Sequence, residues 1–121
     1  MAALTLIAES LRLGSTLAGL GLVVDKITRL APANPVPGQP PTWTLIEFSV
    51  EASSVDALAR HLAEVLDIGP WYVEFHTHAE TFVVFHSRVF RFLRDDNQEH
   101  AIAAAYGRGQ GIPDDQLDWA R

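Results

Sequence analysis

Four side chains that could do chemistry, Glu74, His76, His86 and Arg91, fall within one stretch, residues 71–93 (WYVEFHTHAETFVVFHSRVFRFL). Apolar and polar residues alternate along much of this stretch, which predicts β-strands with one apolar and one polar face. Histidine and glutamate are common general acids and bases in enzymes, and arginine binds anionic groups. The polar face of these strands is therefore the candidate functional site.

Strand pairing decides which of these side chains meet. Pairing residues 71–77 with residues 81–86, through a loop centred on residues 79–81, places Glu74 directly opposite His86. A tight turn at Ser87-Arg88 then makes His76 and Arg91 diagonal neighbours of His86. The same register gathers large apolar side chains on the other face: Trp71, Val73, Phe75, Val83, Phe85, Phe90 and Phe92.

The predicted polar face is still too apolar to face water, so we expect something to cover it. It also carries Tyr72, together with Trp43 and Glu47 from an earlier strand. One interpretation is a pocket for a small organic molecule, in which the charged side chains are its few polar groups. Another is a homodimer interface, in which Glu74 and His86 form a cross-strand ion pair.

Two further interpretations give these residues a chemical role. In a small enzyme, Glu74 would orient His76 or His86 as a general base. Arg91 would then hold an anionic group of the substrate. In a metal site, His76, His86 and Glu74 would bind a divalent ion as a two-histidine, one-carboxylate set, although the fixed charge of Arg91 disfavours a second cation. No cofactor is indicated, and whether the protein is an enzyme stays open.

The surrounding sequence predicts the elements that position the site. Residues 22–30 and 43–51 are predicted strands, separated by a proline-rich loop at residues 31–41. A helix is predicted from Ser53 to about Leu66, and a second from residues 95–97 to Tyr106.

The two ends of the chain are less strongly patterned. Residues 2–20 fit a helical face, and a short strand followed by a turn at Gly14 fits nearly as well. Helix is the favoured interpretation. Near the other end, Pro113 predicts the start of a short closing helix, with Leu117 and Trp119 packing back on the body.

This order of elements predicts an α+β fold. We expect a single antiparallel-rich sheet of about five strands, with the two main helices packed on one face. The order resembles the ferredoxin-like outline of dimeric α+β barrel proteins, whose sheets pair face to face around a ligand cavity. The resemblance lies in the order of elements only. The extra N-terminal strand of the predicted order departs from it, and no site residues are carried over.

Composition narrows the function classes. The chain of 121 residues is long enough for one core, so a single domain is expected over residues 1–121. Its net charge of −6 argues against a nucleic-acid partner, and it has no cysteine for disulfides or thiolate sites. No signal peptide or membrane span is indicated, and a cytoplasmic location is favoured. We expect a small binding or interaction protein, covered by a homodimer partner or a small-molecule ligand.

Overall fold

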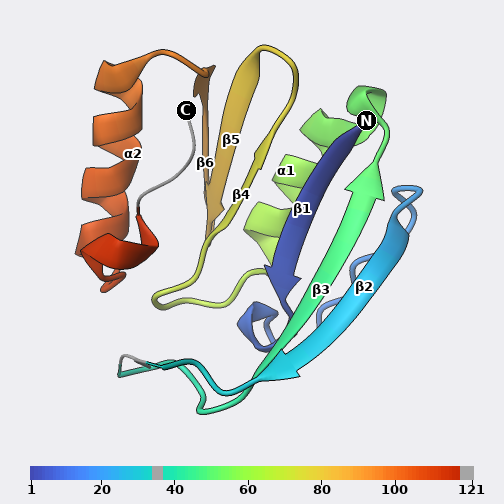
Figure 1. Cartoon of the computed structure of the whole chain (residues 1–121), viewed down its shortest axis with the longest axis vertical. Coiled ribbons are helices and arrows are strands. Elements are labelled where there is room, and N and C mark those ends of the chain that lie inside the picture. Colours follow the sequence, from blue (N-terminus) through green and yellow to red (C-terminus); the bar gives the residue numbers. More distant parts are fainter. Residues whose placement is uncertain (34–36, 118–121) are drawn as a thin grey trace.

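The computed structural model describes residues 1–33 and 37–117. One antiparallel sheet of six strands, in the order β2-β3-β1-β4-β5-β6, runs through the molecule (Figure 1). The strands are β1 (Ala2–Ile7), β2 (Val23–Leu30), β3 (Trp43–Val50), β4 (Val73–His76), β5 (Glu80–Phe85) and β6 (Arg88–Leu93). The predicted α+β class and antiparallel sheet are confirmed, with one strand more than expected.

The additional strand is β1, where a helix was the favoured prediction. Ala2, Leu4 and Leu6 are buried, whereas Ala3 and Thr5 are exposed, which is the two-residue period of a strand. Pairing with β3 satisfies the backbone groups that point to that side of the strand. A 3₁₀ turn, η1 (Ala8–Ser10), follows it directly.

The sheet consists of two three-stranded halves, β2-β3-β1 and β4-β5-β6. Among the described residues a single pair, Leu4 with Phe75, joins β1 to β4. By contrast, β1 and β3 pair from Ala2 opposite Val50 to Ile7 opposite Leu45. The junction between β1 and β4 is therefore the least tightly bonded line of the sheet.

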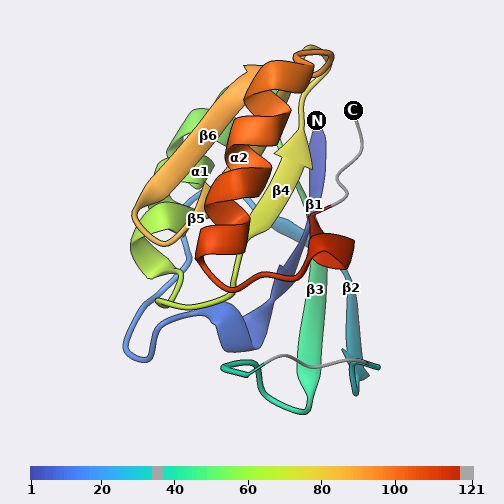
Figure 2. The same cartoon turned by 90° about the vertical axis from the view of Figure 1, so that its left-hand side faces the viewer.

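The two main helices lie on opposite faces of the sheet, so the prediction of one shared face is wrong. Helix α1 (Val55–Val65) packs its buried side chains against both halves, including Leu6, Phe48 and Phe75. Helix α2 (Asn97–Gly109) instead packs with Val83, Phe85, Phe90 and Phe92. Figure 2 shows α2 in front of the β4–β6 half and α1 behind it. We refer to these sides as the α1 face and the α2 face.

Strand β5 explains the error, because it is apolar on both sides. Phe82 and Val84 belong to the core under α1, while Val83 and Phe85 belong to the core under α2. A strand buried on both faces gives a continuous apolar run, as in FVVF at residues 82–85, and such a run does not indicate which side faces which helix.

The connections complete the two layers. The segment between η1 and β2 covers the β3 side of the core on the α1 face. It does so with four leucines, Leu11, Leu17, Leu20 and Leu22. The described part of the proline-rich loop joins β2 to β3, and short turns η2 (Ala52–Ser54) and η3 (Asp114–Gln116) precede α1 and follow α2. Trp119 lies outside the described residues. No helix in the described part of the chain is long and apolar enough to cross a membrane.

Candidate ligand cavity

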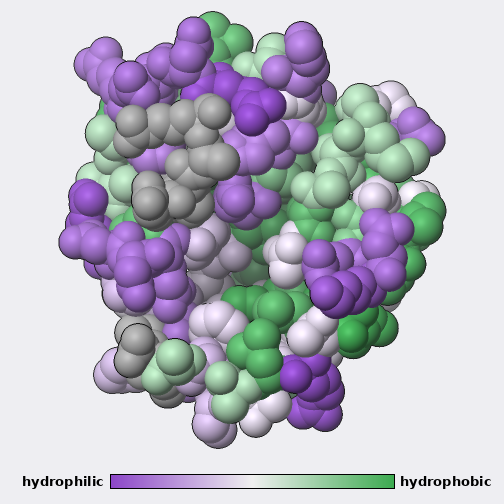
Figure 3. All heavy atoms as spheres, viewed as in Figure 1, coloured by the Kyte–Doolittle hydropathy of each residue, from purple (hydrophilic) through white to green (hydrophobic). Residues whose placement is uncertain are grey.

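Helix α2 covers the β4–β6 half of the α2 face and leaves the other half open to a cavity of about 440 Å³. Figure 3 looks onto this face, which is hollowed near its middle, between the α2 side and the β2–β3 side. Side chains of four strands, β1 to β4, and of the segments beside them line the cavity. They include Ala3, Thr5, Ile7, Asp25, Gln39, Trp43, Leu45, Glu47, Trp71, Tyr72, Glu74, His76 and Gln116.

Two glutamates stand on the strands that cross this cavity. Thr5 of β1 pairs with Glu47 of β3. The pair formed by Leu4 and Phe75 brings Thr5 alongside Glu74 of β4 on its other side. Because neighbouring strands are about 4.8 Å apart, the backbones at Glu47 and Glu74 are separated by about 10 Å, with Thr5 between them. The two glutamate side chains therefore lie on the same face of the sheet, on either side of Thr5.

Glu74 and His76 form a contact at one side of the cavity. Glu74 Oε2 lies 2.8 Å from His76 Nε2, and the two side chains are 31% and 20% exposed. The distance is that of an ion pair, yet the angles are not those of a hydrogen bond, and neither atom has another hydrogen-bond partner among the described residues. The other ring nitrogen, Nδ1, lies 2.8 Å from Oγ1 of the buried Thr81. Both nitrogens of His76 therefore face protein groups.

Aromatic residues close the opposite end of the cavity. The Trp43 and Trp71 rings lie 6.3 Å apart between centroids, tilted by 60°. Gln39, from the proline-rich loop, donates a hydrogen bond of 3.0 Å to the Pro70 carbonyl. Tyr72 donates its hydroxyl proton to the carbonyl of Gln116 in η3. The loop and the C-terminal turn are thereby attached to this end of the cavity.

Glu9 fixes the residue that follows Trp43. The backbone N–H and the hydroxyl of Thr44 donate to the Glu9 carboxylate over 2.6 and 2.8 Å. Burial opposes the charged form, but the hydrogen bonds from Thr44 and the charge of Arg29 outweigh burial and hold the pKa of Glu9 below its ordinary value. This contact ties η1 to the start of β3, where Trp43 enters the cavity wall.

The structure brings five of the predicted site residues to this one cavity: Trp43, Glu47, Tyr72, Glu74 and His76. His86 is elsewhere, because the predicted register was wrong. Glu74 pairs with Val83, not with His86. The register differs from the predicted one by an odd number of residues, so the β5 side chains predicted to share a face with Glu74 lie on the opposite face. His86 occupies the turn between β5 and β6, where its Nδ1 lies 2.8 Å from the Leu66 carbonyl oxygen.

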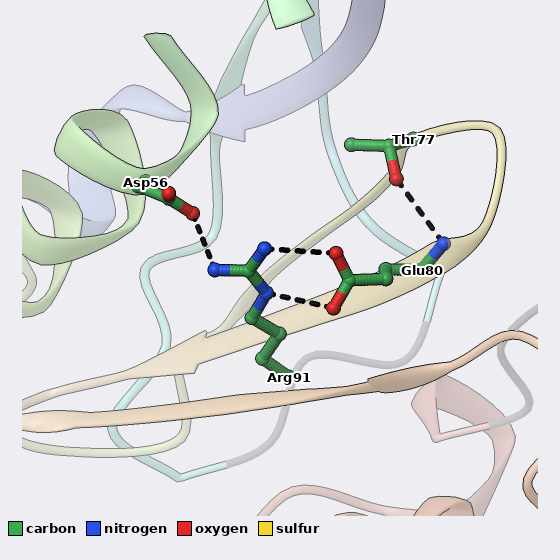
Figure 4. Close-up of polar contacts among 4 residues, drawn as sticks. All are labelled: Asp56, Thr77, Glu80 and Arg91. Carbon is green, nitrogen blue, oxygen red and sulfur yellow. Dashed lines mark hydrogen bonds and ion pairs between the residues drawn. The ribbon is translucent and has the colours of Figure 1, made fainter. Parts of the chain in front are cut away.

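Arg91 lies on the α1 face, away from the cavity. It donates two hydrogen bonds, of 2.7 and 2.8 Å, to Glu80 and a third, of 2.6 Å, to Asp56 of α1 (Figure 4). Its guanidinium carbon is 5.0 Å from the centre of the Phe82 ring. Hydrogen bonds from Arg91 hold the pKa of the Glu80 carboxyl below its ordinary value, and the same bonds raise the pKa of Arg91. Arg91 therefore joins α1 to the sheet and does not hold an anion beside His76.

The two-histidine metal set is not assembled either. Within residues 1–33 and 37–117, no group of three His, Cys, Asp or Glu side chains is arranged to hold a metal ion. Sequence reasoning also missed cavity residues such as Thr5 and Trp71, because it treated residues 2–20 as a helix and placed Trp71 in the core face. The alternation from Ala2 to Leu6 was the signal that could have revealed Thr5.

Comparison with known proteins adds no relative: no protein-family model, curated protein or solved structure matches this chain.

Proposed function

We propose that this protein binds a small organic molecule in the cavity on its α2 face. One observation carries the proposal: an uncovered half of a sheet face forms a cavity of about 440 Å³ with an aromatic end and polar side chains along its walls. Ligand sites in proteins typically have volumes of about 300–1,000 Å³ and combine apolar or aromatic walls with polar groups that orient the ligand.

Binding is favoured over acid–base catalysis by the surroundings of His76. A general base needs a ring nitrogen that can reach the proton to be removed. Both nitrogens of His76 lie 2.8 Å from protein atoms, of Glu74 and Thr81. His86 and Arg91, the other members of the predicted catalytic group, are placed outside the cavity.

A second copy of the chain is the competing occupant of the open face, as in the dimeric α+β barrel outline. The two occupants differ in what they require. A small ligand needs the depth of the cavity, whereas a partner subunit needs the rim and the flat surface around it. Filling the cavity floor without changing the rim therefore separates them.

The Thr5→Tyr variant fills the floor, because Thr5 is exposed in the middle of the cavity and tyrosine is well tolerated in strands. Leu93→Tyr is the matched control, since Leu93 is 58% exposed at the edge strand β6, on the α1 face. Both variants and the unmodified protein would be screened against a library of small organic compounds by two-dimensional NMR. The indole N–H signals of Trp43 and Trp71 report on the cavity.

We expect some compounds to shift these indole signals in the unmodified protein and in Leu93→Tyr, but not in Thr5→Tyr. Native mass spectrometry of the same samples gives the subunit count. Absence of any compound that acts in this way would contradict the proposal. A dimer that Thr5→Tyr leaves intact, with no compound bound, would assign the face to a second copy instead.

A further inference from the structure

The cavity has an acidic lining. Three carboxylate side chains, Asp25, Glu47 and Glu74, face it, and none of the described residues that line it is lysine or arginine. Lys26 stands at the rim, with its Nζ atom 4.0 Å from Glu47 and its side chain 67% exposed. Such an exposed pair contributes little and is easily opened by a competing cation.

Aromatic rings accompany these carboxylates. Trp43, Trp71 and Tyr72 line the same cavity, and the faces of tryptophan and tyrosine rings attract cations. An organic cation that carries an apolar group can therefore place its charge near the carboxylates and its apolar part against the rings. A neutral ligand would gain only from the apolar contacts. An anionic ligand would be repelled by the carboxylates, and no lysine or arginine among the described lining residues would bind it.

The two glutamates also lie on the same face of the sheet, on either side of one strand. Glu47 and Glu74 flank Thr5 on neighbouring strands, so both carboxylates can approach one group held between them. Glu74 is held on one side by its contact with His76, and Oε1 is the oxygen that this contact leaves available. Partial shielding from water inside a cavity strengthens charge interactions relative to the open surface.

From these observations we infer that the ligand of this cavity is an organic cation, such as a primary or quaternary amine attached to an apolar or aromatic group. The inference rests on the proposed function, because it names the chemical class of the ligand for that same cavity. The ammonium group would lie near Glu47 and Glu74, and the apolar part against Trp43 and Trp71.

The test uses three probes of similar size that differ in charge: benzylamine, benzyl alcohol and benzoate. Each would be titrated into the protein at low salt, and the Trp43 and Trp71 indole signals would give the dissociation constant. We expect benzylamine to bind about tenfold more tightly than benzyl alcohol and benzoate to bind more weakly still. Raising the salt concentration should reduce the advantage of benzylamine.

Two variants assign the charge effect to the cavity. Glu74→Gln and Glu47→Gln keep the size of the side chain, and each should remove most of the advantage of benzylamine over benzyl alcohol. Glu64→Gln, at an exposed position of α1, should leave that advantage unchanged. Both probes are compared in the same protein sample. A smaller fraction of folded protein would therefore affect both probes alike and would not by itself change the ratio of their dissociation constants.

The two proposals fail differently. If benzyl alcohol or benzoate shifts the same indole signals as strongly as benzylamine, the cavity binds small molecules but the inferred positive charge is wrong. If benzylamine retains its advantage in both glutamine variants, the charge preference does not come from this cavity and the inference is overturned. If no probe of any charge shifts these signals, the proposed function fails, and the inference fails with it.

Discussion

His76 Nδ1 lies 2.8 Å from the hydroxyl oxygen of Thr81, its cross-strand neighbour, while Nε2 of the same ring lies 2.8 Å from Glu74. The imidazole thus links a buried hydroxyl to a carboxylate at the cavity. Thr81 is 1% exposed, so an apolar side chain in place of the histidine would leave its hydroxyl without this hydrogen-bond partner. His76 is therefore a positioning residue for Glu74 and a partner that Thr81 requires.

Replacing His76 should destabilise the protein through Thr81. We expect His76→Leu to lower the free energy of unfolding by about 1–3 kcal/mol, because the buried hydroxyl loses its partner. The double variant His76→Leu/Thr81→Val should recover most of this loss, since both hydrogen-bonding groups are then apolar. Urea denaturation of the single and double variants measures the difference. If the double variant instead loses the sum of the unfolding free energies that the two single variants lose, the Thr81 hydroxyl does not depend on His76.

Two phenylalanines of β5 test the placement of the helices on opposite faces. Phe82 and Phe85 are each 1% exposed, yet they belong to different cores, one under α1 and one under α2. We expect Phe82→Ala and Phe85→Ala each to lower the free energy of unfolding by about 3–5 kcal/mol. If urea denaturation shows one of them to be as mild as a surface substitution, β5 is not buried on both sides.

Gly107 allows α2 to pack closely on its surroundings. A methyl group at this position would lie 2.7 Å from Cδ2 of the buried Leu117 and 3.5 Å from the Phe85 ring. Alanine favours a helix by about 1 kcal/mol over glycine, but overpacking in a core costs about 1–3 kcal/mol. We expect Gly107→Ala to lower the melting temperature, because the overpacking outweighs the gain in helix propensity.

Gly109 provides the control for that prediction. It lies at the end of the same helix, and a methyl group there would meet no atom within 4 Å. Gly109→Ala should leave the melting temperature unchanged or raise it slightly. Stabilisation by both alanines would mean that Leu117 moves aside without cost.

The ion pair between Glu80 and Arg91 should make stability depend on pH on the acidic side. Hydrogen bonds from Arg91 lower the pKa of Glu80 in the folded state below its ordinary value of 4.5. The contribution is therefore complete above pH 4.5 and is lost as the pH falls through the lower folded-state value. Glu80→Gln should be less stable than the unmodified protein at pH 7, and the difference should shrink towards pH 3.

Because Glu80 and Arg91 are on the surface, we expect a small effect. Urea denaturation at several pH values measures it, with Glu64→Gln as a control for the general loss of a negative charge. A difference between the unmodified protein and Glu80→Gln that stays constant from pH 7 to pH 3 would show that the carboxylate gains nothing from Arg91.

Local patterns were sufficient for much of the fold. In β3 the alternation from Trp43 to Val50 put Trp43 and Glu47 on one face, and Phe48 and Val50, on the other face, are in the core. The start of α2 was also predictable, since the Asp96 side chain accepts the Glu99 N–H as a helix cap. In both cases the signal lies within a few residues of the position that it describes.

For the candidate site too, some features could be predicted from local patterns and others depended on tertiary packing. Glu74 and His76 alternate on β4, with Tyr72 just before it, so the sequence alone determined that they share a face. Only the tertiary structure decided that His86 and Arg91 do not join them, because pairing between β4 and β5 depends on packing against two helices. Because β5 is apolar on both sides, every register of β5 puts apolar side chains on both faces, and the sequence pattern does not distinguish one register from another. The register is selected by packing against the two cores on opposite faces of the sheet.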